Sequence, residues 1–219
     1  MSGQYNFYEL DLRFNNKKIQ SDDFEDLVNQ ILKYDGLKSL SFNLSYNQLY
    51  AKDLSLFVTL LPSFANLKNL FLYVQSLEIG DQGMSYIAQA LEKCQNLNKF
   101  ILQAYSCSIK DKGVEDLGAS LSNSKNLTSA NLWLSENNIS YNGASSLCQQ
   151  ISKNKKLGDL TLYLYSNQLY HQSKEFNTVL ASNKNLKTLV FWFMMYIDPH
   201  LVRQLQRKAI RLVKYQIKH

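Results

Sequence analysis

The chain has 219 residues, 45% of them hydrophobic, and a formal net charge of +6 at pH 7, which fits one or two folded domains with a sizeable core. No apolar stretch, the one containing Val190–Met195 included, is long enough to cross a bilayer, and the first residues lack the basic start and apolar run of a secretion signal. The three cysteines, Cys94, Cys107 and Cys148, are an odd number without metal-ligand spacing, which argues against a disulfide framework and a zinc site.

A repeat of thirty residues organises the chain from its first apolar residue onward. Units begin near residues 7, 37, 67, 97, 127, 157 and 186, the last of them one residue early. Each unit opens with alternating apolar and polar residues, as in Leu40-Ser-Phe42-Asn-Leu44, which predicts a strand with one buried face. The apolar column five positions into the units reads Leu12, Phe42, Leu72, Leu102, Leu132, Leu162 and Phe191.

The second half of each unit switches to helical spacing, with apolar residues at i and i+4. Gly83, Gly113 and Gly143 recur just before these predicted helices, where a tight turn tolerates glycine. The apolar pairs are Leu27/Ile31, Phe57/Leu61, Ile87/Leu91, Leu117/Leu121, Leu147/Ile151 and, in the sixth unit, Phe176/Leu180.

A stack of such units needs a cover at both ends. The residues before Phe7 are too few to make much of one. At the other end, apolar residues at helical spacing predict a capping helix over about residues 200–217. Six Lys or Arg and no acidic residue follow Asp198, which leaves 18 basic and 18 acidic residues in the rest of the chain. The basic excess therefore belongs to the predicted cap and not to the body.

The residues that carry a family resemblance read Leu127-x-x-Ala130-x-Leu132-x-Leu134-x-x-Asn137-x-Ile139 and continue to Ile151. This run resembles the leucine-rich-repeat family, in particular its ribonuclease-inhibitor-like class with a helix in every repeat, over roughly residues 7–200. The resemblance implies an α/β solenoid, a horseshoe with a concave parallel sheet and convex helices, formed by residues 1–219 as one domain. The family's buried Asn or Cys, which bonds backbone in the turn, matches Asn47, Cys107, Asn137 and Asn167, whereas Lys17, Leu77 and Tyr196 stand there in other units.

Residues between the buried columns point out of the concave face. They are polar in the first two units and largely aromatic or apolar in the later five, where the candidate partner-binding residues are Phe71, Tyr73, Ile101, Tyr105, Trp133, Tyr163, Tyr165 and Trp192. An exposed aromatic stripe marks an interface, because Trp and Tyr contribute most binding energy when a partner buries them. The alternative is that aromatic residues suit strands and shield one another across a curved sheet.

The basic residues of the predicted cap are Arg203, Arg207, Lys208, Arg211 and Lys214. They could contact a polyanion, or form the solvated face of a helix. No nucleic-acid motif accompanies them, so we do not expect a nucleic-acid or membrane partner.

We predict a non-catalytic protein-interaction module or scaffold subunit without cofactor or metal, bound to another protein within a larger complex. His171, His200 and His219 stand apart from any serine or carboxylate motif, so no catalytic group can be named. The alternative is a regulator of an enzyme, since the repeats are similar to those of ribonuclease inhibitor and of Ran GTPase-activating protein. The latter family carries an acidic tail, whereas this C-terminus is basic. We expect a cytoplasmic location, with a cytoskeletal or ciliary complex as a natural home.

Overall fold

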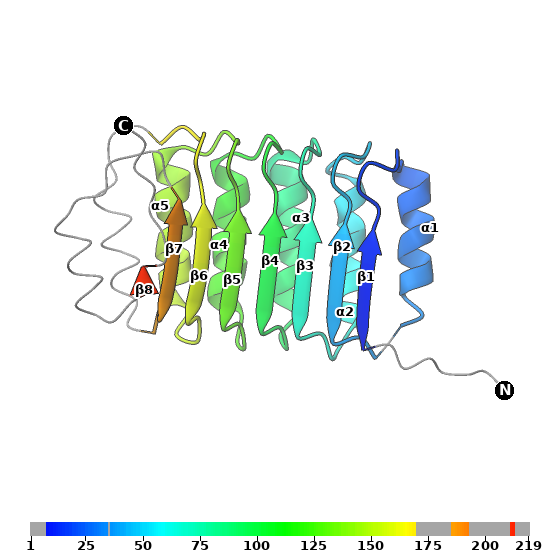
Figure 1. Cartoon of the computed structure of the whole chain (residues 1–219), viewed down its shortest axis with the longest axis horizontal. Helices are drawn as coiled ribbons and strands as arrows, with labels where there is room; N and C mark the ends of the chain where they lie inside the picture. Colours follow the sequence, from blue (N-terminus) through cyan, green and yellow to red (C-terminus); the bar gives the residue numbers. More distant parts are fainter. Residues whose placement is uncertain (1–7, 35, 170–184, 193–210, 213–219) are drawn as a thin grey trace.

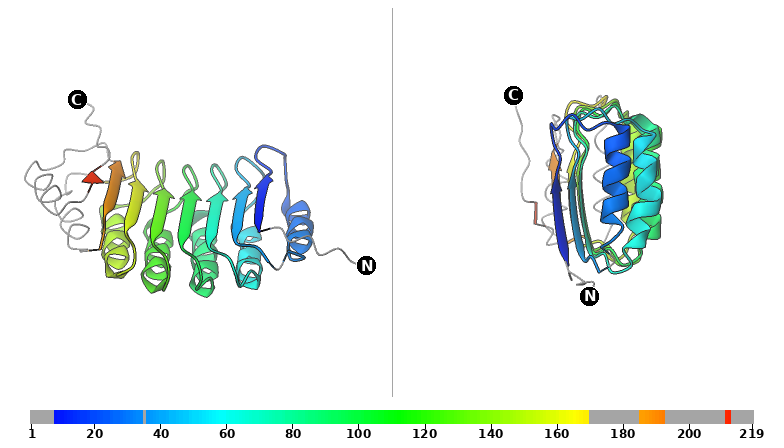
Figure 2. Two further views of the ribbon diagram at one scale, coloured as in Figure 1. Left: turned by 60° about the horizontal axis from the view of Figure 1, so that its bottom comes forward. Right: turned by 90° about the vertical axis from the view of Figure 1, so that its right-hand side faces the viewer.

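The computed structural model describes residues 8–34, 36–169, 185–192 and 211–212, and the structural statements below concern these residues. Strands and helices alternate and form two layers, with the helices stacked on one side of the sheet (Figure 1 and Figure 2). In chain order the elements are β1 (Glu9–Arg13), α1 (Ser21–Ile31), β2 (Ser39–Asn43), the 3-10 helix η1 (Asp53–Leu56), α2 (Phe57–Ser63), β3 (Asn69–Tyr73), α3 (Gly80–Lys93), β4 (Lys99–Gln103), α4 (Asp111–Asn123), β5 (Ser129–Trp133), α5 (Tyr141–Lys153), β6 (Asp159–Tyr163), β7 (Thr188–Trp192) and β8 (Arg211–Leu212).

All strands are parallel and lie side by side in chain order. The register joins residues one repeat apart, so Leu40 pairs with Leu70 and Leu70 with Phe100. Because helices cover one side of the sheet, Leu70 and Leu72 of β3 are fully buried while the residues between them stay partly exposed. The predicted alternation and the predicted parallel sheet are confirmed.

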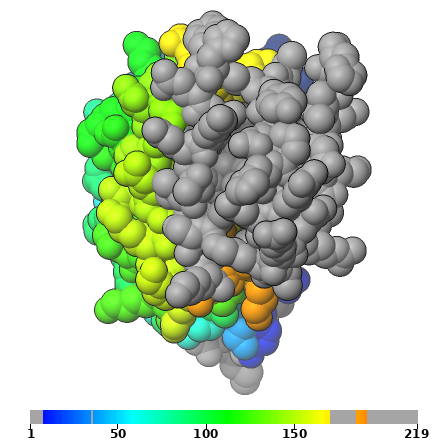
Figure 3. Space-filling model, turned by 90° about the vertical axis from the view of Figure 1, so that its left-hand side faces the viewer, coloured from blue at the N-terminus to red at the C-terminus, as the bar shows by residue number. Residues whose placement is uncertain are grey.

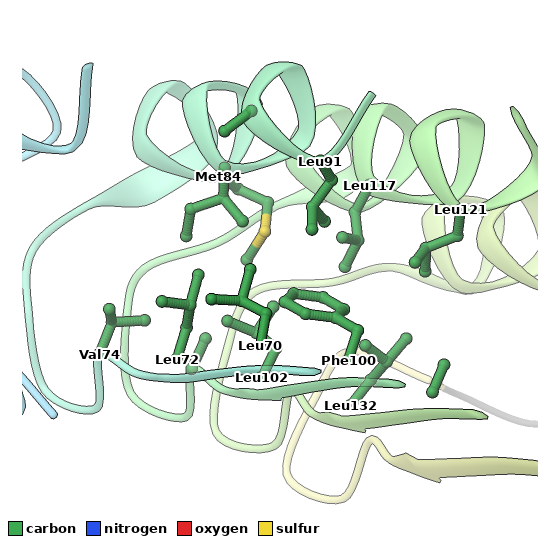
Figure 4. Packing of buried hydrophobic residues seen from close by; sticks show 14 of the residues in the cluster. Leu70, Leu72, Val74, Met84, Leu91, Phe100, Leu102, Leu117, Leu121 and Leu132 are labelled. Carbon is green, nitrogen blue, oxygen red and sulfur yellow. The ribbon is translucent and has the colours of Figure 1, made fainter. Parts of the chain in front are cut away.

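The core lies between the two layers (Figure 4). Leu70 and Leu72 point from β3 toward Met84 of α3, and the next repeat places Phe100 of β4 beneath Leu117 of α4. Fully burying one such side chain stabilises a fold by roughly 1.5–3 kcal/mol. A single repeat has no second layer of neighbours to complete this burial, so the repeats are stable only as a stack.

A phenylalanine cluster packs the first repeat against the second at the N-terminal end of the core. Phe24 of α1 lies against Phe42 and Phe57, with ring centroids 5.8 and 5.7 Å apart, and Phe14 packs on Phe42 from the first repeat. Aromatic rings bury more apolar area than the leucines of later repeats. The first repeat thus packs against the stack through its own aromatic side chains.

Asparagines tie neighbouring repeats together in the turn after each strand. Buried Asn137 accepts hydrogen bonds from the backbone N–H groups of Cys107 and Ile109, both at 3.0 Å, and donates to the carbonyls of Ala104, Leu134 and Ser135. Asn47 makes the equivalent bonds to the first repeat, and Asn167 makes several of them to the fifth. The side chains expected to bond backbone in this turn do so, including the Cys107 thiol, which donates to the Val74 carbonyl at 3.1 Å.

Two of the three recurring glycines have a different reason from the one expected. Gly113 and Gly143 lie inside the first turns of α4 and α5, and neither has a positive φ. A β-carbon on Gly143 would lie 2.7 Å from the carboxyl carbon of Asp111, and one on Gly113 would meet Asp81. These aspartates reach forward to cap the next helix: Asp81 accepts from the N–H groups of Lys110 and Gly113, and Asp111 from that of Ser140. Glycine leaves room for a carboxylate from the preceding repeat.

At the C-terminal end the structure describes Arg211 and Leu212, which form β8 and pair with Thr188 and Leu189 of β7. The prediction of a helix over about 200–217 is wrong at these two residues. A strand here supplies hydrogen-bond partners for the edge of β7, and the helical spacing of apolar residues cannot show that the edge needs such partners. Figure 3 views the molecule from this end, with atoms of β7 in orange. Several predicted features lie outside the described residues: the rest of that helix, the pair Phe176/Leu180, and the basic residues Arg203, Arg207, Lys208 and Lys214.

Candidate functional site

The candidate site is the sheet face, the side of the sheet that looks away from the helices (Figure 2). Its first two strands carry polar side chains. Arg13 and Asp11 of β1 form an exposed ion pair at 2.8 Å. A hydrogen bond from the Ser41 side chain, aided by Arg13, lowers the pKa of Asp11. This end of the face is therefore hydrated and charged.

Aromatic side chains begin at β3. Phe71 and Tyr73 line a shallow hollow of about 500 Å³ whose other lining residues include Glu9 and Asp11. The ammonium group of Lys99 lies 5.5 Å from the centre of the Phe71 ring, within the range of a cation–π contact.

A second aromatic pair lies on β5 and β6. Trp133 and Tyr163 are partners in the parallel register, and their rings stack with centroids 4.3 Å apart and planes inclined by 34°. The Trp133 indole N–H donates to the Asn131 side-chain oxygen at 2.7 Å, which fixes the orientation of the indole. The stack is a rigid, amphipathic platform that has little side-chain freedom left to lose on binding a partner.

Strand β4 separates the two aromatic pairs. Gln103 occupies the position between Tyr73 and Trp133 in the register, and its side-chain oxygen accepts a hydrogen bond from Gln75. The predicted stripe is thus two aromatic pairs flanking a polar strand position. Adjacent strands lie about 4.8 Å apart, so the two pairs are close enough to contact one partner segment.

The structure places the side chains of seven of the eight predicted site residues, and these form two groups. Phe71, Tyr73, Ile101, Trp133 and Tyr163 lie on the sheet face and are half-buried, because neighbours on adjacent strands cover one another. Trp192 pairs with Tyr163 in the register, but its side chain lies outside the described residues. Tyr105 and Tyr165 lie beyond the ends of β4 and β6, at the edge where the chain leaves the sheet.

Tyr46 also lies at this edge, although the sequence did not identify it as a candidate site residue. Its hydroxyl lies 2.5 Å from that of Tyr105, although the two residues belong to different repeats. This hydrogen bond, together with burial, raises the pKa of Tyr105 to about 12, and burial together with Glu136 raises the pKa of Tyr165. Tyr46 has a left-handed backbone with φ of 60°, which turns its side chain away from the alternation of the strand. The pattern of period two that located the other residues therefore could not locate it.

The described residues offer little that resembles a reaction centre. No group of three or more His, Cys, Asp or Glu among them could hold a metal ion. Burial raises the pKa of Cys94, Cys107 and Cys148 to about 12, so their thiols are not activated nucleophiles. Within the described part of the chain, no helix has the length and apolar character needed to cross a bilayer.

No model of a protein family and no curated protein matches this chain. Solved structures do match it, among them one described as "Leiomodin-1 Actin-Binding Site 2 (ABS2)", with a TM-score of 0.51 and 17% sequence identity. That match covers 71% of this chain and 84% of the other. At this identity the likeness shows the fold alone. The chain has a leucine-rich-repeat fold, an all-parallel sheet with stacked helices, which confirms the predicted resemblance and fold class.

Proposed function

We propose that this chain is a protein-binding module that takes its partner on the sheet face, centred on the stacked rings of Trp133 and Tyr163. The observation that supports it most is the fixed, half-exposed stack itself. Two large rings held at the solvent surface of a sheet are costly to hydrate, and a partner that covers them gains their burial without having to order them. A protein partner fits because aromatic residues dominate protein interfaces.

The polar first strands set the edge of this surface. Ion-paired Asp11 and Arg13 and the polar side chains of Ser41 and Asn43 form a hydrated border beside the aromatic pairs. An apolar centre with a polar border is the usual anatomy of a reversible protein interface. We extend the proposal to a cytoplasmic scaffold at the cytoskeleton, because the similar solved structure is described as an actin-binding site.

The test uses alanine substitutions with a matched control. Trp133→Ala and Tyr163→Ala remove the stack, and Tyr50→Ala removes a tyrosine that is 50% exposed in the turn after β2. The intact chain is used as bait in extracts of the cells that produce it, and each captured protein is then purified and its Kd for the variants measured. We expect a loss of at least tenfold for the two stack variants and less than twofold for Tyr50→Ala, with melting temperatures unchanged within a few degrees.

Actin is the first purified protein to test, because the similar solved structure is described as an actin-binding site. Co-sedimentation with actin filaments gives the Kd directly. A regulator of an enzyme would bind through the same face, so the same variants apply if the captured protein is an enzyme. Binding that survives loss of the stack, or variants that melt far lower while binding normally, would show that the rings only shield one another.

A further inference from the structure

The charges of the solenoid body are segregated between its two long edges. We call the edge where the chain passes from a helix into the next strand the helix-to-strand rim; it is the lower edge in Figure 1. The opposite edge, where the chain leaves each strand for a helix, is the strand-to-helix rim. The sequence shows equal numbers of basic and acidic residues before the C-terminal stretch, and the repeat sorts them by position within the unit.

The helix-to-strand rim is strongly basic. Its described segments contain ten exposed lysines against two carboxylates, Glu92 and Asp159. The strand-to-helix rim carries five lysines against seven carboxylates. The helix-to-strand segments are residues 32–34, 36–39, 63–69, 92–99, 122–129, 152–159 and 185–188, and the strand-to-helix segments are 14–23, 44–53, 74–82, 104–112, 134–142 and 164–169.

Stacking turns these lysines into a row. Lys68, Lys125 and Lys155 stand at the entrances to β3, β5 and β6 and are all exposed. Neighbouring strands lie about 4.8 Å apart, which is shorter than the screening length of about 8 Å at physiological salt. Positive potentials from adjacent repeats therefore overlap along the rim and favour an extended anionic ligand over a single anion.

The lysines are not needed to complete the helix ends. Side chains of Asn96, Asn126 and Asn154 donate to the carbonyls of Ala65, Gln95 and Leu121, which lie at these ends. The two ion pairs among the described residues, Arg13–Asp11 and Lys112–Asp116, both lie away from the rim. The ammonium groups of the row therefore carry charge that no carboxylate in the described part of the chain neutralises.

We propose that the helix-to-strand rim binds an acidic polypeptide segment laid along the axis of the solenoid. From residue 92 onward the rim segments contain no aromatic residue on which a nucleic-acid base could stack. In the same segments the leucines, such as Leu97 and Leu127, are buried, so this part of the rim offers no apolar anchor to a bilayer. This proposal is independent of the sheet-face function.

The experiment measures binding of a fluorescein-labelled oligoglutamate of twenty residues to the full chain by fluorescence anisotropy. The test variant carries Lys68→Glu, Lys125→Glu and Lys155→Glu on the helix-to-strand rim. The control variant carries Lys17→Glu, Lys52→Glu and Lys110→Glu on the strand-to-helix rim, so both variants have the same net charge and the same C-terminal stretch. Circular dichroism and melting temperature confirm that both fold.

We expect the test variant to bind oligoglutamate at least tenfold more weakly than the wild type and the control variant to stay within threefold. Equal loss in both variants would overturn the proposal, since it would show attraction to net charge alone. Unchanged binding by the test variant, or no binding by the wild type at 100 mM salt, would also overturn it. Tighter rim-dependent binding of single-stranded oligothymidylate or of phosphatidylserine vesicles than of oligoglutamate would assign the rim to another ligand class and reject the acidic polypeptide.

Discussion

Replacing Asn137 by Ala should destabilise the chain far more than a typical surface substitution and about as much as truncating a core residue. The Asn137 side chain is buried and serves backbone groups of two repeats at once, accepting from Cys107 and Ile109 and donating to three carbonyls. Alanine cannot accept these bonds, and the two N–H groups lie where water does not reach them. Leaving a buried donor unsatisfied costs about 1–3 kcal/mol, so two such donors predict a loss of about 2–6 kcal/mol in the free energy of unfolding.

The control for this change is the next residue. Asn138 is exposed, its backbone N–H bonds to the Ile109 carbonyl, and that bond is kept in Asn138→Ala. Urea unfolding followed by circular dichroism gives both free energies, and an unchanged m-value shows that the comparison concerns stability alone. We expect Asn138→Ala to stay within about 0.5 kcal/mol of the wild type. A loss below about 1 kcal/mol for Asn137→Ala would refute the assignment of this side chain as a tie between repeats.

Two further outcomes follow from the packing. Gly143→Ala should lower the free energy of unfolding by about 1–3 kcal/mol, because the new β-carbon would meet Asp111. Gly158→Ala is the control and should be close to neutral, since its β-carbon finds no atom nearer than 3.8 Å. Urea unfolding measures both variants, and equal stabilities would contradict the explanation that glycine leaves room for the capping aspartate. Burial raises the pKa of the three cysteine thiols from 9.0 to about 12. In the folded chain at pH 8 they should therefore stay protonated and unreactive toward dithionitrobenzoate, and in urea they should react fully. Rapid reaction of the native protein would contradict their burial.

Much of the fold could be predicted from the repeat because hydrophobic period reports which residues share a face. Leu70, Leu72 and Val74 are buried as expected, and the thirty-residue spacing is the register of the sheet. The reason for Gly143 was missed, because the group that needs the space, Asp111, comes from another repeat. A pattern within one unit cannot show what its neighbour places against it.

The sequence predicted which aromatic residues lie on the sheet face but not how their side chains are arranged. The position of Trp133 and Tyr163 on one face follows from alternation, whereas their stacking depends on side-chain conformations set across two strands. The basic rim was missed because its lysines, such as Lys125 and Lys155, are a whole repeat apart in the sequence and their charge is cancelled by acidic residues in the net charge of the chain. Only their shared phase in the stack reveals them.

The forward-reaching aspartates also bear on how such a chain can lengthen. Asp81 caps the helix of the following repeat and Asp111 does the same one unit later, so the junctions on either side of α4 use the same parts. A tandem duplication of residues 82–111 would reproduce a complete junction at its new boundary, with the glycine and the carboxylate already matched. The unit of residues 82–111 can therefore be copied without a change at this junction, whereas the units that end at Ala51 and Tyr141 lack the aspartate that would make it.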